Sequence, residues 1–463
     1  MRPYDMSPDE FRRHGHEVVD WIANYLENTR DYPVVPRVQP GDLAASLPTS
    51  APELGESMES ILAGFQSQIL PAVTHWNHPR FHGYFSVSAS APGILGEMLA
   101  AALNVNGMVW LSCPASVELE AVVMSWLRQW IGLPENFFGM IHDTASLSTL
   151  HAIAAARVVA DPDLRQKGGR SGLILYTSEH AHSSIEKGAL SLGLGRDHVR
   201  KIGVDDQYRM RPDLLREAIA SDLAQGLTPF CVVSTTGTTS VSSIDPVAAI
   251  QDVADEFELW HHIDAAYGGP AAILPEMRWI LDGADRADSL VINPHKWLFT
   301  PIDLSAFYCR RPEILRQAFA LVPEYLKTSQ DNVAVNLMDY GIPLGRRFRA
   351  LKLWFVMRWF GREKVIAILR SHIEWAGELR AFVEADPRFE ICAPTPLSLV
   401  CFRLRAGDDA TRRLLDDINA SGVAFLSGNV LDGRFVLRFA IGNVGTTRED
   451  IFLTWNKLQE LAG

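Results

Sequence analysis

A lysine follows a strongly apolar run in the segment ADSLVINPHKWLF, residues 287–299. The run Leu290–Ile292 predicts a buried strand, and Pro294 ends it just before the tripeptide HKW. Lysine is rarely buried, because its ammonium group loses its hydration in the interior. Lys296 therefore either reaches solvent or has a chemical role, and an amine held at a strand end can act as a nucleophile.

Three other polar motifs also lie next to predicted buried strands. Asp264 ends the strand in LWHHIDAAYGG, His182 follows another strand in SEHAHSSIEKG, and the residues TAS at 144–146 begin a predicted helix. Each has an ordinary explanation when taken alone: a helix cap or salt-bridge partner, a structural histidine, and a plain N-cap. Since ligands of open α/β sheets lie beyond the carboxyl ends of the strands, we expect these groups to gather around Lys296.

Together these groups suit pyridoxal phosphate. An amine can hold the cofactor aldehyde as a Schiff base, and a carboxylate that faces the pyridine nitrogen can keep it protonated, so that the ring accepts electrons. A flat side chain stacked on the ring would fix its plane. The free N–H groups at a helix N-terminus would bind the phosphate.

Composition narrows the class of protein. The 463 residues predict two or three domains, and the net charge of −12 argues against a nucleic-acid or anionic-membrane surface. The five cysteines are scattered without CxxC spacing, so we expect reduced thiols and no metal site. The N-terminus lacks an apolar signal segment, and polar residues interrupt the most apolar window, 93–110. We therefore expect a soluble, cytoplasmic protein.

The order of predicted elements indicates three regions. A capping box at Ser7–Glu10 begins a helix, and a second helical stretch follows at 56–72, which together predict an N-terminal helical arm over residues 1–80. The apolar face of this arm needs a cover, either from its own chain or from a second subunit. Alternating strands and helices predict a large α/β domain over residues 81–362, with a mostly parallel sheet. A small α+β domain is expected over residues 363–463.

The chain resembles the group II pyridoxal-phosphate decarboxylases, and among them the aromatic-L-amino-acid decarboxylases. The resemblance covers nearly the whole chain, through motifs such as VTHWNHPRFHGYF, HAHSSIEK, HIDAAYGG, NPHKW and GIPLGRRFRALKLW. The combination of DAAY with NPHKW is its most specific part. It implies the fold type I of pyridoxal-phosphate enzymes, with a mostly parallel seven-stranded sheet in the large domain. It also implies a homodimer with active sites at the subunit interface.

The resemblance assigns roles to individual residues. Lys296 would carry the cofactor, Asp264 would face the pyridine nitrogen, and His182 would stack on the ring opposite Ala266. The other cofactor contacts that it implies are Thr144, Ala145, Ser146, Thr239, Ser289, Asn293 and His295, with Leu344 and Gly345 from the partner subunit. Thr239 would also lie close to Lys296. The substrate contacts that it implies are Trp76, Tyr84, Phe85, Val87 and Arg438, with Asn106 and Met108 contributed across the dimer.

The implied activity is decarboxylation of an aromatic L-amino acid (tryptophan, tyrosine, phenylalanine or a hydroxylated derivative) to the arylalkylamine. In the family, a loop tyrosine protonates the quinonoid carbanion. Counting back from Ile342 without a gap puts Leu337 at that position. Tyr340, the nearest tyrosine, is either a catalytic substitute or structural, and His182 is a second candidate proton donor. An aldehyde synthase, an acidic amino acid decarboxylase and a non-catalytic cofactor-binding scaffold stay open as alternatives.

Overall fold

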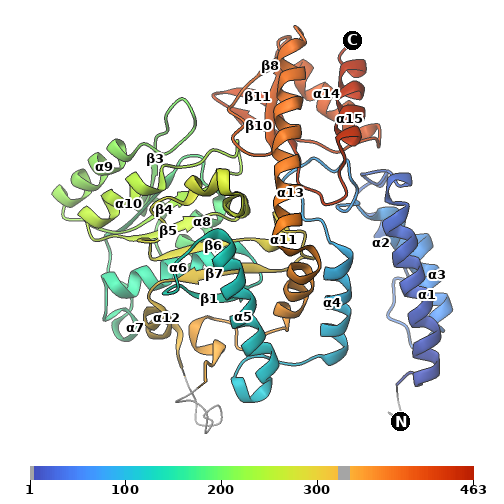
Figure 1. Cartoon of the computed structure of the whole chain (residues 1–463), viewed down its shortest axis with the longest axis horizontal. Coiled ribbons are helices and arrows are strands. Elements are labelled where there is room, and N and C mark those ends of the chain that lie inside the picture. Colours follow the sequence, from blue (N-terminus) through green and yellow to red (C-terminus); the bar gives the residue numbers. More distant parts are fainter. Residues whose placement is uncertain (1–4, 322–333) are drawn as a thin grey trace.

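A seven-stranded sheet forms the centre of the large domain (Figure 1). The structure is a computed structural model that describes residues 5–321 and 334–463. The strand order is β1-β7-β6-β5-β4-β2-β3, and β7 runs antiparallel to both of its neighbours while the other pairs are parallel. The predicted mostly parallel sheet is thus confirmed. Its strands are β1 Phe138–His142, β2 Leu173–Ser178, β3 Val199–Ile202, β4 Thr228–Thr235, β5 Trp260–Asp264, β6 Ser289–Ile292 and β7 Ser305–Cys309.

Helices cover both faces of this sheet. Successive side chains of β4 point to opposite faces: Cys231 and Val233 pack with the helices α6 and α8, whereas Val232 packs with α9 and α10. The helices of the large domain are α4 Ala91–Leu103, α5 Pro114–Ile131, α6 Ala145–Ala160, α7 Leu164–Lys167, α8 Ser183–Ser191, α9 Pro212–Ala224, α10 Val247–Glu256, α11 Pro294–Trp297 and α12 Pro312–Phe319. Within the described residues, no helix combines the length and apolar character that a membrane crossing requires.

The small domain is a four-stranded antiparallel sheet with helices against it. The strand order is β10-β11-β9-β8, and the strands are β8 Phe389–Ile391, β9 Leu399–Leu404, β10 Ser427–Leu431 and β11 Arg434–Ala440. Its own helices are α14 Asp408–Ala420 and α15 Arg448–Leu461. The long element α13, Arg349–Ala385, joins the two domains and is interrupted at Gly361, where φ is 62° and ψ is 170°. This conformation is essentially restricted to glycine, and it lies beside the expected domain boundary at residue 362.

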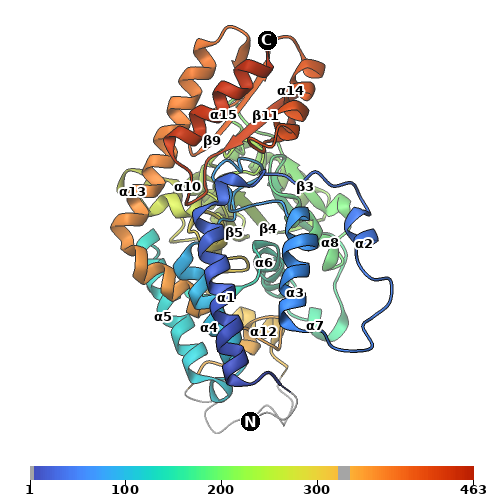
Figure 2. The same cartoon turned by 90° about the vertical axis from the view of Figure 1, so that its right-hand side faces the viewer.

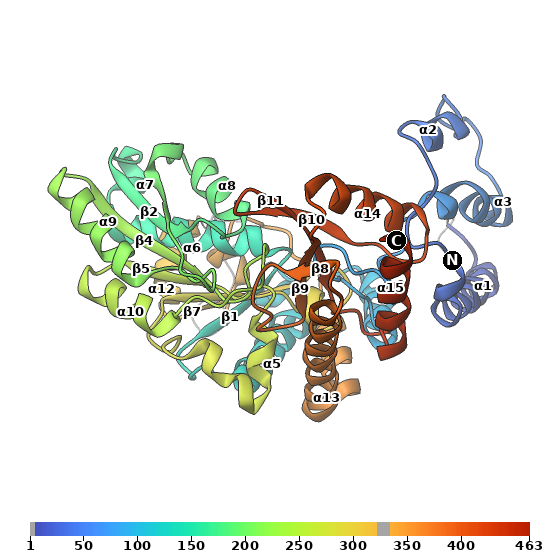
Figure 3. The same ribbon diagram turned by 90° about the horizontal axis from the view of Figure 1, so that it is seen from above.

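The N-terminal arm lies at the opposite end of the molecule from α9 (Figures 1 and 3), and α1 and α3 face the viewer in Figure 2. Its helices are α1 Pro8–Glu27, α2 Asp42–Ser46 and α3 Met58–Gly64. The predicted capping box is present, since the Ser7 hydroxyl accepts the Glu10 N–H and the Glu10 carboxylate accepts the Ser7 N–H. Trp21 of α1 packs on Phe65 at the end of α3 with ring centroids 5.0 Å apart, yet Phe11 is 68% exposed. The chain itself therefore covers only part of the apolar face of α1.

Candidate active site

Lys296 lies in a single helical turn at the carboxyl end of β6, between two side chains that are fixed in the core. Nδ1 of His295 accepts a hydrogen bond from the Leu304 N–H at 2.9 Å. The fully buried Trp297 donates its indole N–H to Nδ1 of His372 at 3.0 Å. These two anchors fix the turn, and Lys296 between them lines a cavity.

The cavity that Lys296 lines, which we call the inner cavity, has a volume of about 240 Å³. Residues from the ends of several strands line it. The predicted residues that line it with Lys296 are Thr144, Ala145, Ser146, His182, Thr239, Asp264, Ala266, Asn293 and His295. It is also lined by Phe85, which was expected at the substrate, and by four residues that the sequence did not single out: Ser184, Thr235, Gly237 and Tyr267. Thr235 and Gly237 lie in the hydroxyl-rich stretch STTGTTSVSSID, which was the one available signal for them.

The charges in this cavity favour a reactive amine. Burial lowers the pKa of Lys296 below its ordinary value, and the nearby carboxylate of Asp264 opposes this shift only in part. A larger fraction of the amine is then neutral and nucleophilic. Burial also lowers the pKa of His182, and the nearby carboxylate of Asp264 opposes this shift. Nδ1 of His182 accepts the Ser184 N–H at 3.2 Å, which places the proton of the neutral ring on Nε2.

One end of the inner cavity is suited to an anion. Thr144 is the N-cap of the 16-residue helix α6, and its hydroxyl accepts the Leu147 N–H at 3.4 Å. The first residues of α6, Ala145 and Ser146, line the cavity. Their backbone N–H groups have no partner within the helix, and the positive end of the helix dipole lies at the same place. Close by, the side-chain oxygens of Asn293 and Thr235 are buried without a hydrogen-bond partner in the part of the chain that the structure describes. Such groups are rare in proteins and mark positions that a polar ligand would satisfy.

The residues present therefore fit pyridoxal phosphate. Lys296 would supply an amine for the aldehyde, Asp264 a carboxylate for the ring nitrogen, and the start of α6 the N–H groups for the phosphate. His182 and Ala266 would lie against the faces of the ring.

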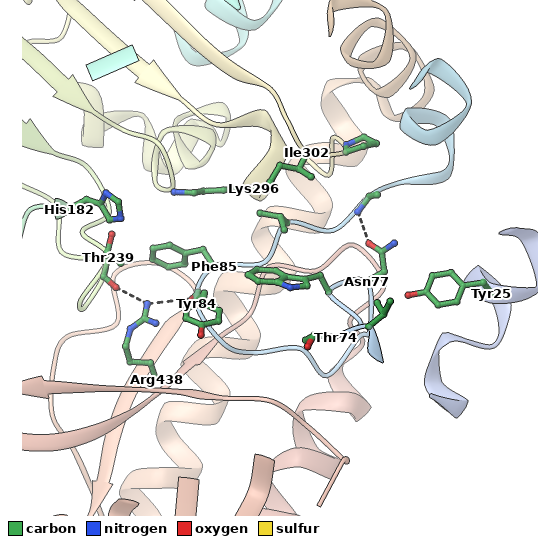
Figure 4. A pocket seen from close by; sticks show the side chains of 15 residues that line it. Tyr25, Thr74, Asn77, Tyr84, Phe85, His182, Thr239, Lys296, Ile302 and Arg438 are labelled. Carbon is green, nitrogen blue, oxygen red and sulfur yellow. Dashed lines mark hydrogen bonds between the residues drawn. The ribbon is translucent and has the colours of Figure 1, made fainter. Parts of the chain in front are cut away.

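A larger, outer cavity of about 650 Å³ shares Phe85, His182, Thr239 and Lys296 with the inner one (Figure 4). Its aromatic wall consists of Trp76, Tyr84 and Phe85, and Trp76 stacks on Tyr84 with centroids 5.6 Å apart. The predicted Val87 and Arg438 also line it. The other lining residues are Tyr25, Val73, Thr74, Asn77, Ala89, Pro301 and Ile302. Of these, Val73, Thr74 and Asn77 belong to the motif VTHWNHPRFHGYF.

Arg438 is buried in the wall of the outer cavity and is held by oxygen atoms of its own chain. Its guanidinium donates to the carbonyl oxygens of Thr239 at 2.7 Å and Ser240 at 3.1 Å, and to the Ser427 hydroxyl at 2.8 Å. Burial lowers its pKa, and no carboxylate of the described residues forms an ion pair with it. Arg438 thus fixes the turn that carries Thr239.

Comparisons with known proteins agree with this site. A family model described as the pyridoxal-dependent decarboxylase conserved domain matches residues 40–405. The chain belongs to the pyridoxal-dependent decarboxylase family. The aromatic-L-amino-acid decarboxylase of Rattus norvegicus is 41% identical, over 99% of this chain and 96% of the relative. The phenylacetaldehyde synthase of Arabidopsis thaliana is 40% identical, again over 99% of this chain and 96% of the relative.

A solved structure gives the same result. The crystal structure of Oryza sativa TDC with PLP and tryptamine superposes with a TM-score of 0.96 at 35% identity, covering 100% of this chain and 99% of that one. The protein is thus a carboxy-lyase that depends on pyridoxal phosphate, as the resemblance implies.

One predicted cofactor contact of the decarboxylase lies elsewhere. Ser289 is the first residue of β6, and its hydroxyl binds the indole N–H of Trp260 at 3.0 Å and Nδ1 of His262 at 2.9 Å. At about 3.3 Å per residue, the start of β6 is about 13 Å from Asn293 at its carboxyl end. The structure therefore does not bring Ser289 to the inner cavity of its own chain.

Four other predicted residues of the decarboxylase gather on its surface, away from their own Lys296. The side-chain oxygen of Asn106 accepts the Arg346 N–H at 2.9 Å, beside Leu344 and Gly345, and the Met108 carbonyl accepts the Met338 N–H at 3.1 Å. None of the four lines either cavity. This arrangement is compatible with the predicted contribution to a partner subunit, which stays a prediction.

Tyr340 also lies away from Lys296 of its own chain. Its ring stacks on Phe138 with centroids 4.7 Å apart and lies 6.0 Å from the guanidinium carbon of Arg316. Partial burial raises its pKa, and Leu337 in the same short helix is buried in the core. In its own chain Tyr340 packs as a structural residue, and the structure does not bring it to the cavities where proton transfer would occur.

Proposed function

We propose that the decarboxylase removes CO2 from an aromatic L-amino acid and releases the arylalkylamine. The observation that carries this proposal is the aromatic wall of Trp76, Tyr84 and Phe85 in the outer cavity, which opens directly onto Lys296. Aromatic side chains bind an aromatic substrate by stacking and by burial of apolar area. The relatives support the same class of substrate. One is named aromatic-L-amino-acid decarboxylase, and the solved structure of another contains PLP and tryptamine.

The charges of the outer cavity argue against an acidic substrate. A second carboxylate on the substrate side chain would need a cationic partner. Among the residues that line the outer cavity in the described chain, the lysine and arginine side chains are Lys296 and Arg438. The first is the predicted cofactor lysine, and the second is held by carbonyl and hydroxyl oxygens of Thr239, Ser240 and Ser427.

The walls of the outer cavity would also favour decarboxylation. When bound, pyridoxal phosphate supplies a conjugated, electron-poor ring that accepts the electrons left at Cα when CO2 departs. Asp264 would keep a proton on the ring nitrogen and so maintain that electron deficiency. Trp76 and Phe85 would exclude water from the reacting carboxylate, and a dry, apolar environment favours the loss of its charge.

We assign the proton that must return to Cα to His182. His182 lines both cavities together with Lys296, and its neutral ring carries the proton on Nε2. Tyr340, the other candidate, lies against Phe138 instead. In this proposal His182 both covers one face of the cofactor ring and acts as the general acid.

The proposal includes a homodimer. Thr144 and Ser146, at the predicted phosphate site, are exposed in the single chain, and Leu344 is exposed as well. A second copy that places its Leu344 and Gly345 over the start of α6 would close the phosphate site, and its Asn106 and Met108 would complete the substrate pocket. A cytoplasmic location, as the scattered cysteines suggest, is also part of the proposal.

A substrate panel with mass detection of the products tests the function. L-tryptophan, L-tyrosine, L-phenylalanine and L-glutamate are incubated with the holoenzyme, and at least one aromatic substrate is expected to give the amine and CO2 in equal amounts. Aldehyde with stoichiometric peroxide would identify an aldehyde synthase. Turnover of glutamate alone would identify an acidic amino acid decarboxylase. If no amino acid changes the absorbance spectrum of the bound cofactor, the protein is a non-catalytic cofactor-binding scaffold.

A further inference from the structure

The segment 342–345, which we call the crossing segment, is exposed between two fixed ends. Ile342 is 60% and Leu344 46% exposed. At its far end the buried Arg346 donates to the Glu120 carboxylate at 2.5 Å and to the Ile141 carbonyl at 2.9 Å. Such paired, buried contacts define the backbone position at that end.

The near end of the crossing segment is held by one buried histidine. The Ile342 N–H donates to Nε2 of His151 at 3.0 Å, and Nδ1 of His151 lies 2.7 Å from the Leu147 carbonyl within α6. A carbonyl only accepts, so Nδ1 carries the proton and Nε2 is left as the acceptor for Ile342. Burial lowers the pKa of His151 to about 4, which keeps the ring in this neutral form.

The surroundings of His151 are shaped for this contact. Its ring lies between the rings of His142 and Phe319, with centroids 4.4 Å and 4.5 Å away. On the side of the crossing segment, a Cβ atom on Gly341 would come within 2.6 Å of Nε2. The hydrogen bond from Ile342 thus needs both an acceptor at residue 151 and a residue without a side chain at 341.

We propose that His151 is a positioning residue for the cofactor site of the partner subunit. Its helix, α6, begins at Thr144 in the phosphate site of its own chain, while its imidazole fixes the segment that carries Leu344 and Gly345 toward the other chain. One helix thereby links both phosphate sites of the dimer. This inference rests on the proposed function, because it requires the homodimer in which the crossing segment reaches the partner.

Three variants isolate the contact. His151→Leu keeps much of the side-chain volume and removes the acceptor, whereas His151→Gln retains an amide oxygen for the Ile342 N–H and an N–H for the Leu147 carbonyl. Gly341→Ala brings a methyl group against Nε2 and breaks the same hydrogen bond from the other side. Hydrogen exchange of the peptide that contains Ile342 is expected to be at least about tenfold faster in His151→Leu and Gly341→Ala, and closer to wild type in His151→Gln.

Hybrid dimers test the action across the interface. Two differently tagged chains are co-expressed, and one carries Lys296→Ala, so that a hybrid has a single lysine that can bind the cofactor. The affinity of that site for pyridoxal phosphate is read from the visible absorbance of the lysine-bound cofactor. His151→Leu in the Lys296→Ala chain is expected to weaken the affinity about tenfold, since it removes a buried hydrogen bond. In the other chain it should have a clearly smaller effect.

The control is Leu344→Ala in the Lys296→Ala chain. If this control leaves the affinity unchanged, the shared site of the proposed homodimer is wrong. If the control weakens binding but His151→Leu acts only in the chain that carries Lys296, or not at all, the homodimer stands and the inference about His151 is overturned. Unchanged exchange of the Ile342 amide in both His151→Leu and Gly341→Ala would overturn it as well.

Discussion

Trp297 and His372 form a hydrogen bond of 3.0 Å that ties the turn of Lys296 to the long helix α13. The two rings are nearly parallel, at 5°. Tyr267 stacks on Trp297 with ring centroids 4.9 Å apart, and Phe85 stacks on Tyr267 with centroids 3.5 Å apart. Burial lowers the pKa of His372 to about 3, so its Nδ1 stays available as an acceptor at all moderate pH values. These four aromatic side chains thus connect the wall of the outer cavity, at Phe85, to the turn that carries Lys296 and to the helix α13, which joins the two domains.

Asp264→Asn is expected to keep most of the bound cofactor but to lower kcat by about 100-fold or more, because a neutral amide cannot hold the ring nitrogen in its cationic form. Steady-state CO2 release and the absorbance of the bound cofactor measure the two properties separately. Asp252→Asn, at an exposed carboxylate of α10, is the matched control. Turnover of Asp264→Asn at the wild-type rate would contradict the assigned role.

The capture of pyridoxal phosphate by the cofactor-free protein is expected to accelerate with rising pH. The neutral amine is the nucleophile, and burial lowers the pKa of Lys296 from its ordinary 10.5. The rate should therefore reach half of its maximum at a pH below 10.5, and stopped-flow absorbance between pH 6 and 10 measures it. A profile that follows an ordinary lysine would show that burial does not activate the amine.

Trp76→Ala is expected to raise KM for the best aromatic substrate about tenfold, because it removes one stacking surface from the outer cavity. The bound-cofactor absorbance should be unchanged, since Trp76 does not line the inner cavity. Trp279→Ala removes a half-exposed tryptophan that lines neither cavity and serves as the control. Equal KM values for Trp76→Ala and wild type would show that Trp76 does not contribute to binding of the aromatic substrate.

Arg438→Leu is expected to lower the free energy of unfolding by about 3 kcal/mol, because it removes the hydrogen bonds that the buried guanidinium donates to Thr239, Ser240 and Ser427. Denaturant unfolding followed by intrinsic fluorescence measures the loss. Arg434→Leu, at a half-exposed arginine of the same strand, should cost less than about 1 kcal/mol. If the two variants were equally stable, Arg438 would not have the structural role that its contacts indicate.

The sequence predicted the site residues at the strand ends better than the residues that form the cavity walls. Asp264 and Lys296 each follow a buried apolar run, and the parallel sheet brings such ends to one edge; the structure places both in one cavity. Pro301 and Ile302 come to the outer cavity from a connection without a periodic pattern, so only tertiary packing reveals them.

Two predicted residues show what a motif alone cannot decide. Ser289 and Asn293 belong to the same motif, but the length of β6 separates them, and the hydroxyl of Ser289 binds Trp260 and His262 instead. Tyr340 was the nearest tyrosine in sequence to Leu337, yet its ring stacks on Phe138 and lines neither cavity. In both cases the competing partners are distant in sequence.

Gly361 introduces a kink into α13 on its way from the large domain to the small domain. The part of α13 before Gly361 packs in the large domain, whereas the part after it first contacts the large domain through His372 and then enters the core of the small domain through Leu379 and Val383. The backbone angles at Gly361 set the direction of this second part. Arg438 belongs to the small domain but lines the outer cavity opposite Lys296. The space available to a substrate side chain therefore depends on the torsion angles of a residue that touches neither substrate nor cofactor.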